Sequence, residues 1–404
     1  MSYDAVVIGC GPAGSSTATH LAKHGLSVLA LDKAPFPRYH IGESLTGTVA
    51  DYLRDLGLEQ AMGEHQFPVK YGVSVVGREA RNEFFVATAP EPAWQVVRSR
   101  FDRTLLENAV ENGVEHRVGT VLDVTRDGDR VTGIRYRDPE GDTVEAAAPC
   151  VVDASGANTV LSKLCVAGPR IADDFGDQIA IFSQIADCDR DPGLMAGNTV
   201  IFYSENHHWA WMIPLDERVA SVGVVVPREI YLEQLAAARE HGEEATRAIF
   251  DWGLTVINPE LERRCGGREL TETVRVIRDY SYAIEPYAGP GWLCVGDAHR
   301  FVDPIFSFGV AIAFHEAEMA ADAITGALNG GDSTALFNEY QRRCNIGQCA
   351  VSDVIRYFWR FPAFFGVQAR GPFREDIMKL FAGACYDEKP IPGLVMMRES
   401  LAKA

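Results

Sequence analysis

Residues 3 to 32 read YDAVVIGCGPAGSSTATHLAKHGLSVLALD, with two apolar runs on either side of a glycine-rich turn and a helical pattern. The first apolar run covers Tyr3 to Ile8 and the second covers Ser27 to Leu31. Between them, Ser15 to His24 carries apolar residues at helical spacing. Strand, helix and strand in this order predict a βαβ unit, and therefore a fold of the α/β class with a parallel sheet.

The turn GCGPAG places Gly9, Gly11 and Gly14 between the first strand and the helix. Glycines at this spacing let the backbone turn tightly and approach a pyrophosphate at the helix N-terminus. Asp32 closes the second strand, where a carboxylate can accept hydrogen bonds from ribose hydroxyls. This context favours a dinucleotide site over a plain glycine turn. The residues that we assign to cofactor binding here are Gly9, Gly11, Pro12, Ala13, Gly14, Asp32 and Lys33.

A second element, GWLCVGDAHRFVDPIFSFGV at residues 291 to 310, distinguishes FAD from NAD. An apolar strand ends at Gly296 and Asp297, and Ser307 to Gly309 open a long helix. Asp297 is placed to bind a ribityl hydroxyl, and N–H groups at the helix start can hold an anion or a flavin carbonyl. An ordinary strand-to-helix turn is the alternative. The pattern resembles the second FAD motif of the p-hydroxybenzoate-hydroxylase-like flavoproteins, which implies roles in FAD binding for Asp297, Pro304 and Gly309.

Further segments resemble the flavin-dependent halogenases of that superfamily. WAWMIP, residues 209 to 214, is similar to their W-x-W-x-I-P signature, and VKYG, residues 69 to 72, places Lys70 where they carry an essential lysine. VVDASG, residues 151 to 156, matches the strand and turn near the FAD. The other matching segments, PFPRYHIGESL and VVRSRFD, contribute Arg38, Gly42, Glu43, Ser44, Arg98 and Asp102. From all of these segments the resemblance adds Arg38, Ser44, Arg98, Asp153 and Gly156 to the cofactor-binding residues.

The resemblance implies halogenation of an electron-rich aromatic ring that depends on FADH2 and O2. A flavin C4a-hydroperoxide would oxidise halide to hypohalous acid, which Lys70 would direct to the substrate. Chloride or bromide needs positive potential without a metal, and backbone amides at Phe308 and Gly309 could provide it. An ammonium beside apolar walls has its charge disfavoured, so the pKa of Lys70 could fall. The alternative is that Lys70 is a solvent-exposed surface lysine.

Trp209 and Trp211 are two residues apart and therefore point to one face of an extended strand. The resemblance implies that they form a barrier between substrate and flavin; the residues of this barrier are Trp209, Trp211, Ile213 and Pro214. Ordinary inter-domain core is the alternative, and burial alone does not separate the two.

Two positions depart from the family. Phe308 follows Ser307 where a small residue is usual, so its ring could narrow the anion site, and Phe306 replaces the glutamate of tryptophan halogenases. These residues indicate the phenol or pyrrole class, some of whose members act on carrier-protein-tethered substrates. Three alternatives stay open: a flavin monooxygenase, a dehydrogenase or reductase of the same fold without halide chemistry, and a flavin-binding protein without turnover.

Other candidate residues carry weaker signals. Glu43 and Asp303 could be general acids or bases, although exposed or structural carboxylates are the interpretation that we favour. We assign no catalytic role to the scattered histidines, which include His207, His208, His299 and His315. The aromatic stretch at residues 353 to 373 either lines a substrate cavity, covers the flavin domain, or belongs to the core.

Composition limits the partners and the compartment. The formal net charge of -18 over 404 residues argues against nucleic acid or an anionic membrane. No apolar stretch approaches the ~18 residues of a membrane span, and the N-terminus lacks a signal-peptide pattern, so we expect a cytoplasmic protein. Nine scattered cysteines show no metal spacing and are expected to be buried thiols. No nicotinamide site is evident, so a separate flavin reductase is expected to supply FADH2.

The expected architecture is α/β with α+β elements. A discontinuous Rossmann-like FAD-binding domain covers residues 1–68, 98–170 and 272–345, including strands joined by an Asp127-Gly128 hairpin. A mixed β-sheet substrate domain covers 69–97 and 171–271, with strands at 178–228 and one helix from Tyr231 to Trp252. A helical C-terminal segment covers 346–404.

Overall fold

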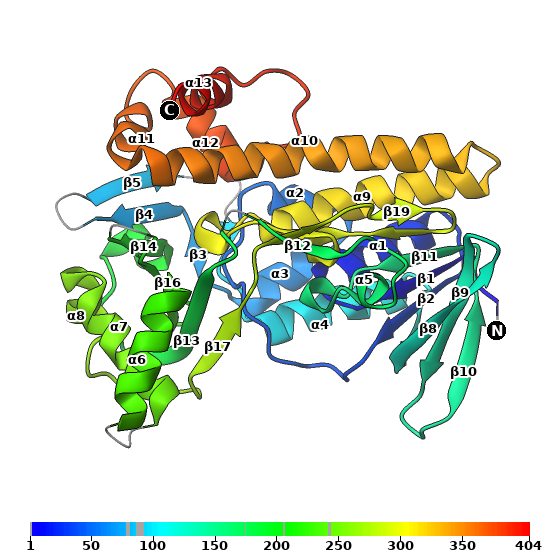
Figure 1. Ribbon diagram of the computed structural model, residues 1–404, viewed down its shortest axis with the longest axis horizontal. Helices are drawn as coiled ribbons and strands as arrows, with labels where there is room; N and C mark the ends of the chain where they lie inside the picture. Colours follow the sequence, from blue (N-terminus) through cyan, green and yellow to red (C-terminus); the bar gives the residue numbers. More distant parts are fainter. Residues whose placement is uncertain (1, 78–80, 86–92, 174, 205–206, 241–243) are drawn as a thin grey trace.

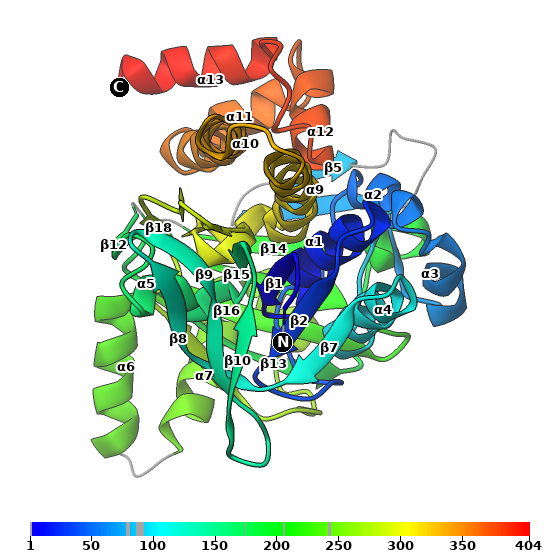
Figure 2. The same cartoon turned by 90° about the vertical axis from the view of Figure 1, so that its right-hand side faces the viewer.

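The computed structural model describes all residues except 1, 78–80, 86–92, 174, 205–206 and 241–243. Figure 1 shows three groups of elements: a sheet with helices around it on the right, a second sheet with helices on the left, and helices across the top. Figure 2 shows the same helices above both sheets from a second direction. This arrangement confirms the predicted class, an α/β fold with a Rossmann-like unit, a β-sheet unit and a helical C-terminal part.

The first sheet forms around the glycine-rich segment, and its strand order is β19-β20-β11-β1-β2-β7. Its members are β19 (Ala288–Gly289), β20 (Trp292–Cys294), β11 (Cys150–Asp153), β1 (Ala5–Ile8), β2 (Val28–Asp32) and β7 (Glu115–Val118). All neighbours pair in parallel except the edge strand β19. The central strands are buried along their whole length, which explains why they read as unbroken apolar runs.

Helices cover this sheet and carry the predicted motifs. The βαβ prediction is confirmed, because α1 (Pro12–Lys23) joins β1 to the parallel strand β2. The helix predicted after Gly309 is α9 (Gly309–Leu328). The remaining helices of this half are α2 (Val49–Asp55), α3 (Glu59–His65), α4 (Arg98–Glu111) and α5 (Val160–Lys163).

The Asp127-Gly128 hairpin is confirmed. It joins β8 (Thr120–Asp127) to β9 (Arg130–Arg137), and Gly128 has a φ of 57°, a value that suits glycine in a tight turn. β10 (Thr143–Ala147) completes this small antiparallel sheet.

The second sheet has seven strands in the order β17-β13-β16-β15-β14-β4-β5. Their bounds are β17 (Arg275–Arg278), β13 (Gln178–Ala186), β16 (Val219–Pro227), β15 (Trp209–Pro214), β14 (Thr199–Tyr203), β4 (Gly72–Val76) and β5 (Arg81–Phe85). The strands expected between residues 178 and 228 are confirmed as β13 to β16. β17 joins this sheet although residues 272–345 are assigned to the FAD-binding domain, so the sheet extends past that proposed boundary.

The prediction of one continuous helix from Tyr231 to Trp252 is wrong. The chain forms α6 (Arg228–Glu240) and α7 (Ala245–Val256), followed by α8 (Pro259–Cys265). Residues 241–243 between them lie outside the described residues, and Gly242 is a poor helix former that the apolar periodicity did not weigh.

The C-terminal helices lie over both halves of the molecule. α10 (Ser333–Arg360) has 28 residues and is therefore about 42 Å long. It packs along α9 and crosses from one half to the other in Figure 1, so the boundary proposed at residue 346 falls within one continuous helix. The chain ends with α11 (Pro362–Gln368), α12 (Arg374–Ala382) and α13 (Pro392–Ala402).

Short elements complete the description. The strands are β3 (Val69–Lys70), β6 (Ala93–Trp94), β12 (Arg170–Ala172), β18 (Tyr282–Ile284) and β21 (Arg300–Phe301), and the 3-10 helices are η1 (Gly156–Asn158), η2 (Gly193–Gly197), η3 (Gly296–Ala298) and η4 (Pro304–Phe306). Within the described ranges no helix is both long and apolar enough to cross a membrane. Seven cysteines are buried as expected, but Cys165 and Cys349 are exposed, so the prediction is wrong for these two.

Candidate active site

The glycine-rich turn is shaped by close backbone contacts. Gly9 has a φ of 97°, and a Cβ atom there would lie 2.5 Å from the carbonyl oxygen of Ala154. A Cβ atom on Gly14 would lie 1.8 Å from the carbonyl oxygen of Gly9. At Gly11 the nearest atom to such a Cβ is Nη2 of Arg38 at 3.7 Å, so the backbone before Pro12 is open. Helix α1 therefore presents an uncapped N-terminus beside free space, the geometry that a pyrophosphate requires.

Asp32 lies at the end of β2 and is buried. Its carboxylate accepts from the backbone N–H of Cys10 at 2.9 Å and from that of Ala34 at 3.1 Å. Arg38 Nη2 lies 3.4 Å from the same carboxylate. Lys33 points elsewhere, because its Nζ donates to Asn158 at 3.1 Å on the exposed surface.

Arg98, at the start of α4, ties the segment after β2 to this domain. It forms two hydrogen bonds with Asp102, at 2.7 and 3.0 Å, and donates to the carbonyl oxygens of Ile41 at 2.7 Å and Gly42 at 3.2 Å. Arg38 lies 3.8 Å from Asp102. The two predicted arginines are thus brought together around one buried carboxylate.

Asp153 and Gly156 form the turn after β11. The Asp153 carboxylate is buried and accepts from the N–H groups of Ser155 at 3.0 Å and Leu161 at 2.7 Å. Each carboxylate oxygen thus accepts a hydrogen bond within the turn. Asp153 would therefore contribute to cofactor binding by fixing the shape of the backbone. Gly156 has a φ of 61° in open space.

The second motif is anchored by a buried acid that sequence reasoning missed. The N–H of Gly296 donates to Glu316 Oε2 at 2.7 Å, and His299 Nε2 lies 2.8 Å from the same oxygen. Gln348 on α10 donates to Glu316 Oε1 at 3.1 Å. Although burial alone raises it, the pKa of Glu316 is lowered by His299 and by these hydrogen bonds. Burial raises the pKa of the neighbouring Asp297 to about 7.

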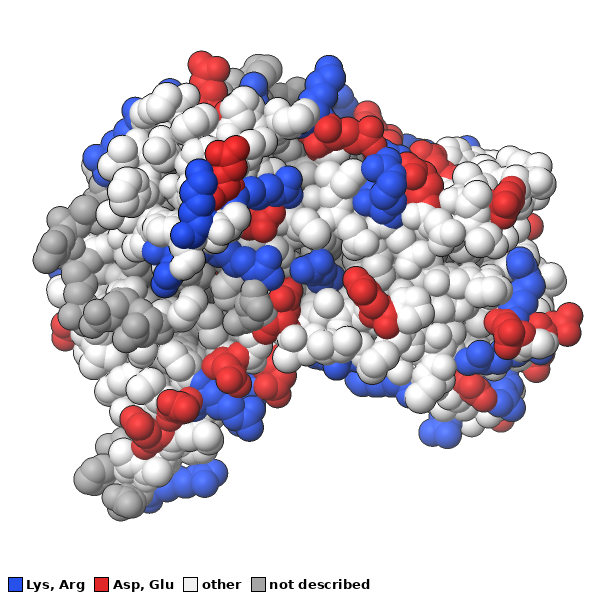
Figure 3. Space-filling view, turned by 45° about the horizontal axis from the view of Figure 1, so that its top comes forward, with Lys and Arg blue, Asp and Glu red and all other residues white. Residues whose placement is uncertain are grey.

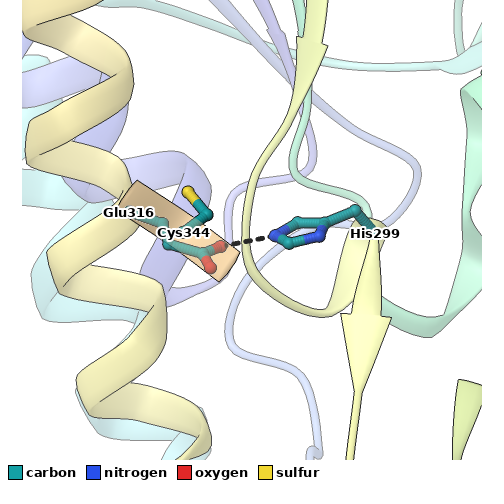
Figure 4. A group of neighbouring side chains, drawn as sticks. All are labelled: His299, Glu316 and Cys344. Carbon is teal, nitrogen blue, oxygen red and sulfur yellow. Dashed lines mark hydrogen bonds and ion pairs between the residues drawn. The ribbon is translucent and has the colours of Figure 1, made fainter. Parts of the chain in front are cut away.

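Figure 4 shows the His299 ring pointing to Glu316 on α9, with Cys344 of α10 beside the carboxylate. The ligand atoms of these three buried residues lie within 4.8 Å of one another, a grouping that could hold a metal ion. Glu316 Oε2, however, already pairs with His299 and Gly296. The arrangement is therefore explained as an internal hydrogen-bonded pair that fixes the turn at Gly296. No sequence signal indicated it, because its members come from three separate segments.

The anion site predicted at Phe308 and Gly309 falls at the start of α9. Its N-cap residue Phe308 makes no side-chain cap, and a Cβ atom on Gly309 would meet nothing within 4 Å. Ser307 has a φ of 63°, which turns the chain into the helix. The Phe308 ring packs with Phe306 and Phe381, at centroid distances of 6.4 and 5.9 Å. The Phe308 ring thus belongs to the buried aromatic core, and a narrowing of the anion site by this ring stays a prediction.

Two further predicted carboxylates, Asp303 and Glu43, are buried. The Asp303 carboxylate accepts a hydrogen bond from the Ile305 N–H at 2.9 Å and so caps η4, which begins at Pro304. Burial raises the pKa of Asp303 to about 7. Burial likewise raises the pKa of Glu43 to about 7; one oxygen accepts from Gly42 N–H at 3.1 Å and the other has no partner among the described residues. Asp303 is a structural cap, and neither carboxylate is exposed.

Lys70 on β3 is 1% exposed, so the alternative of a surface lysine is wrong. Its Nζ donates to Ser44 Oγ and to the carbonyl oxygen of Leu45, both at 2.8 Å. Ser44 Oγ in turn lies 2.8 Å from Thr199 Oγ1, which accepts from Gln95 at 2.9 Å. Burial lowers the pKa of Lys70 from 10.5 to about 7. The amine is thus held in a fixed position by neutral oxygens.

Trp209 and Trp211 lie on the same face of β15, with ring centroids 5.7 Å apart. Trp211 Nε1 donates to Ser221 Oγ at 3.2 Å, and a Cβ atom on Gly223 would lie 2.1 Å from the Trp211 ring. Ile213 lies on this face as well. The intervening Met212 belongs to the core on the other face, where its Sδ lies 3.8 Å from Sγ of Cys265 in α8. The strand ends at Pro214. These side chains form an apolar wall that also includes Phe306 and Phe308.

Comparisons with known proteins agree with this geometry. Residues 2–353 match the FAD binding domain family. A pyrrole-2-carbonyl (peptidyl-carrier protein) brominase of Pseudoalteromonas luteoviolacea is 43% identical over 387 residues, 96% of this chain and 93% of that protein. The corresponding chlorinase of Pseudomonas fluorescens is 30% identical over 432 residues, 99% of this chain and 93% of that protein. The solved structure of the flavin-dependent brominase Bmp2 matches with a TM-score of 0.93 at 42% identity. The match covers 100% of this chain and 99% of the Bmp2 chain.

The fold, the glycine-rich turn and the second FAD motif define an FAD-dependent enzyme. More narrowly, the chain belongs to the flavin-dependent halogenases. The predicted family is confirmed, and so is its placement nearer the pyrrole class than the tryptophan class.

The residues present fit FAD. The open backbone at Gly11, the uncapped starts of α1 and α9, and the carboxylates of Asp32 and Asp297 offer partners for pyrophosphate, ribose and ribityl groups. With FAD bound, Gly9 to Gly14, Asp32, Arg38, Arg98 and Asp297 would hold it. Phe308 and Gly309 would offer their N–H groups to a halide.

Proposed function

We propose that this enzyme halogenates a pyrrole-2-carbonyl group carried as a thioester on a peptidyl carrier protein, with bromide or chloride. The buried Lys70 carries the proposal, since it pairs with no carboxylate among the described residues. It also lies in a chain that matches two pyrrole-2-carbonyl carrier-protein halogenases over nearly its full length. Reduced FAD and O2 would supply the oxidising equivalents that turn halide into an electrophilic halogen.

Lys70 would pass this halogen to the ring. With a pKa of about 7, the amine is divided between its neutral and protonated forms near neutral pH. The neutral form can accept an electrophilic halogen, and the protonated form can donate a hydrogen bond to hypohalous acid. In either form, Ser44 and Leu45 fix the nitrogen, so the ring is halogenated at the carbon that faces it.

Trp209 and Trp211 would keep the organic substrate away from the flavin. Both indoles are nearly fully buried and are backed by the strand pair β15 and β16. Large rigid rings at this place exclude a pyrrole from the flavin side, whereas a halide or hypohalous acid is smaller than the pyrrole ring. The wall therefore supports halogen transfer over direct oxygen insertion.

The uncapped start of α9 would hold the halide, because free N–H groups at a helix N-terminus attract anions without a metal. A separate flavin reductase would supply FADH2, since no nicotinamide motif is evident in the sequence.

The test supplies a flavin reductase, NADH, FAD, O2 and bromide or chloride with a carrier protein bearing the pyrrole-2-carbonyl thioester. Mass spectrometry of the carrier arm should show replacement of ring hydrogen by halogen. Free pyrrole-2-carboxylate should be a poor substrate. A hydroxylated arm, or an unmodified arm while flavin is oxidised, would contradict the proposal.

A further inference from the structure

Helix α11 is apolar on both of its faces. Phe365 and Gly366 are buried, whereas Phe364 is 62% exposed and Val367 is 63% exposed. Phe364 and Val367 are three residues apart and therefore lie on one side of the helix. A helix face that contacts only water is normally polar, so these two side chains form an unpartnered apolar face.

Arginines border this face. Residues 354 to 374 contain Arg356, Arg360, Arg370 and Arg374 and no acidic residue, in a chain whose net charge is -18. Arg356 pairs with Asp173 and Asp353, at 3.7 Å each. The side chains of Arg360, Arg370 and Arg374 are exposed, the first before α11 and the other two after it. In Figure 3, Lys and Arg prevail around an uncharged area at the upper left, where the C-terminal helices come forward. The stretch from 354 to 374 is thus basic, and Asp353 precedes it while Glu375 and Asp376 follow it.

The buried face of α11 leads toward Lys70. Phe365 contacts Phe306 and Phe381, at centroid distances of 6.1 and 6.0 Å. Next to Phe381, the carbonyl oxygen of Ala382 accepts from the backbone N–H of Thr48 at 2.8 Å. Thr48 follows closely after Ser44, whose Oγ holds the Lys70 amine. The buried face of α11 is therefore linked, through Phe381 and Ala382, to the segment whose Ser44 holds the Lys70 amine.

We propose that Phe364 and Val367, with Arg360, Arg370 and Arg374 around them, are the docking surface for an acidic carrier protein. This inference rests on the proposed function, because it concerns delivery of the same tethered substrate. The phosphodiester of a phosphopantetheine arm and the acidic helix that bears it are anionic, and arginine is suited to both. The apolar pair would bury the uncharged side of that helix, and the arginines would set its orientation.

The experiment measures binding of a phosphopantetheinylated peptidyl carrier protein bearing the pyrrole-2-carbonyl group, by isothermal titration calorimetry. Two variants alter the surface: Phe364→Asp with Val367→Asp, and Arg360→Glu with Arg374→Glu. Leu232→Asp with Arg239→Glu is the matched control, since both residues are exposed on α6, far from α11 in Figure 1. Each surface variant should weaken binding about tenfold or more, as interface hot spots do, and the control should not. Added salt should weaken binding to the wild type more than to the arginine variant.

A kinetic readout separates docking from chemistry. The surface variants should raise KM for the loaded carrier and leave turnover of the pyrrole-2-carbonyl N-acetylcysteamine thioester unchanged. Unchanged carrier affinity, equal loss with the small thioester, or no binding to the wild type would overturn the proposal. So would sedimentation showing that α11 joins two copies of this chain. If the carrier binds through α11 but is not halogenated, the docking surface stands and the proposed function fails.

Discussion

The Nζ atom of Lys70 lies 2.8 Å from Oγ of Ser44, and this hydrogen bond joins β3 to the segment whose carbonyl groups at Ile41 and Gly42 bind Arg98. The segment from Ile41 to Ser44 therefore touches both the FAD-binding half and the amine. A displacement of that segment would move Nζ relative to the substrate ring, so the position of the amine depends on residues of both halves.

Replacing Ser44 tests this bond. Ser44→Ala leaves Nζ with one acceptor, Leu45, so the amine should lose its fixed direction. We expect kcat to fall about tenfold, the value of one hydrogen bond to a charged group. The rate is measured at saturating FAD, because Ser44 is also one of the predicted cofactor-binding residues. Ser400→Ala, which removes a hydroxyl bonded within α13, is the matched control and should retain full activity; equal rates in both variants would remove Ser44 from the mechanism.

The depressed pKa of Lys70 predicts a pH-dependent stability. The folded pKa is about 7 and the ordinary value is 10.5, so between these values the unfolded chain binds more protons than the folded one. Stability contributed at this site therefore rises with pH across that window, and below it the buried amine costs on the order of 5 kcal/mol. Lys70→Met should be more stable than wild type near pH 7, with a difference that shrinks toward pH 10.5. Urea unfolding at several pH values measures this.

Lys389→Met, at an exposed position, is the control for that series. It should show no such pH-dependent difference. A difference between Lys70→Met and wild type that stays constant across the window would mean that Lys70 keeps its ordinary pKa.

The glycine-rich turn gives a prediction about FAD binding. In Gly14→Ala the new Cβ would lie 1.8 Å from the Gly9 carbonyl oxygen, so the turn must open. FAD affinity should fall at least tenfold, as read from flavin fluorescence on titration. Gly63→Ala, in helix α3 with nothing within 4 Å of the new atom, should bind FAD normally and gain up to about 1 kcal/mol of stability. Normal FAD binding by Gly14→Ala would contradict the assignment.

The tryptophan wall can be disturbed without touching a tryptophan. In Gly223→Ala the new Cβ would lie 2.1 Å from the Trp211 ring, so the indole must shift, at a cost of about 1–3 kcal/mol. Less halogenated product per flavin oxidised is expected. Gly253→Ala crowds Val224 on the opposite face of the same sheet and should cost stability without changing that ratio. An unchanged ratio in Gly223→Ala would favour ordinary core for these indoles.

Local patterns in the sequence predicted the βαβ unit, the start of α9 and the shared face of Trp209 and Trp211, because each depends on neighbours in the chain. The environment of Lys70 could not be predicted in this way. Its partners at Ser44 and Leu45, and Thr199 behind them, meet only when β3, β14 and the segment after β2 fold together. The same holds for Glu316 and Gln348, whose polar contacts lie between helices.

Composition and apolar periodicity also could not predict the exposure of Cys165 or the division of the expected helix into α6 and α7. Both depend on where the chain turns. Periodicity continues across a short break, and a cysteine count says nothing about which thiols reach the surface.

The most direct test of the role of Lys70 is to assay the Lys70→Met variant for halogenation of the loaded carrier protein. The assay contains FAD, reductase and bromide, and free methionine removes any hypohalous acid that escapes from the enzyme. The variant should bind FAD and oxidise reduced flavin, yet transfer no halogen to the pyrrole, a loss of at least about a hundredfold. Halogenation at the wild-type rate would contradict the account, since the halogen would then reach the ring without the lysine.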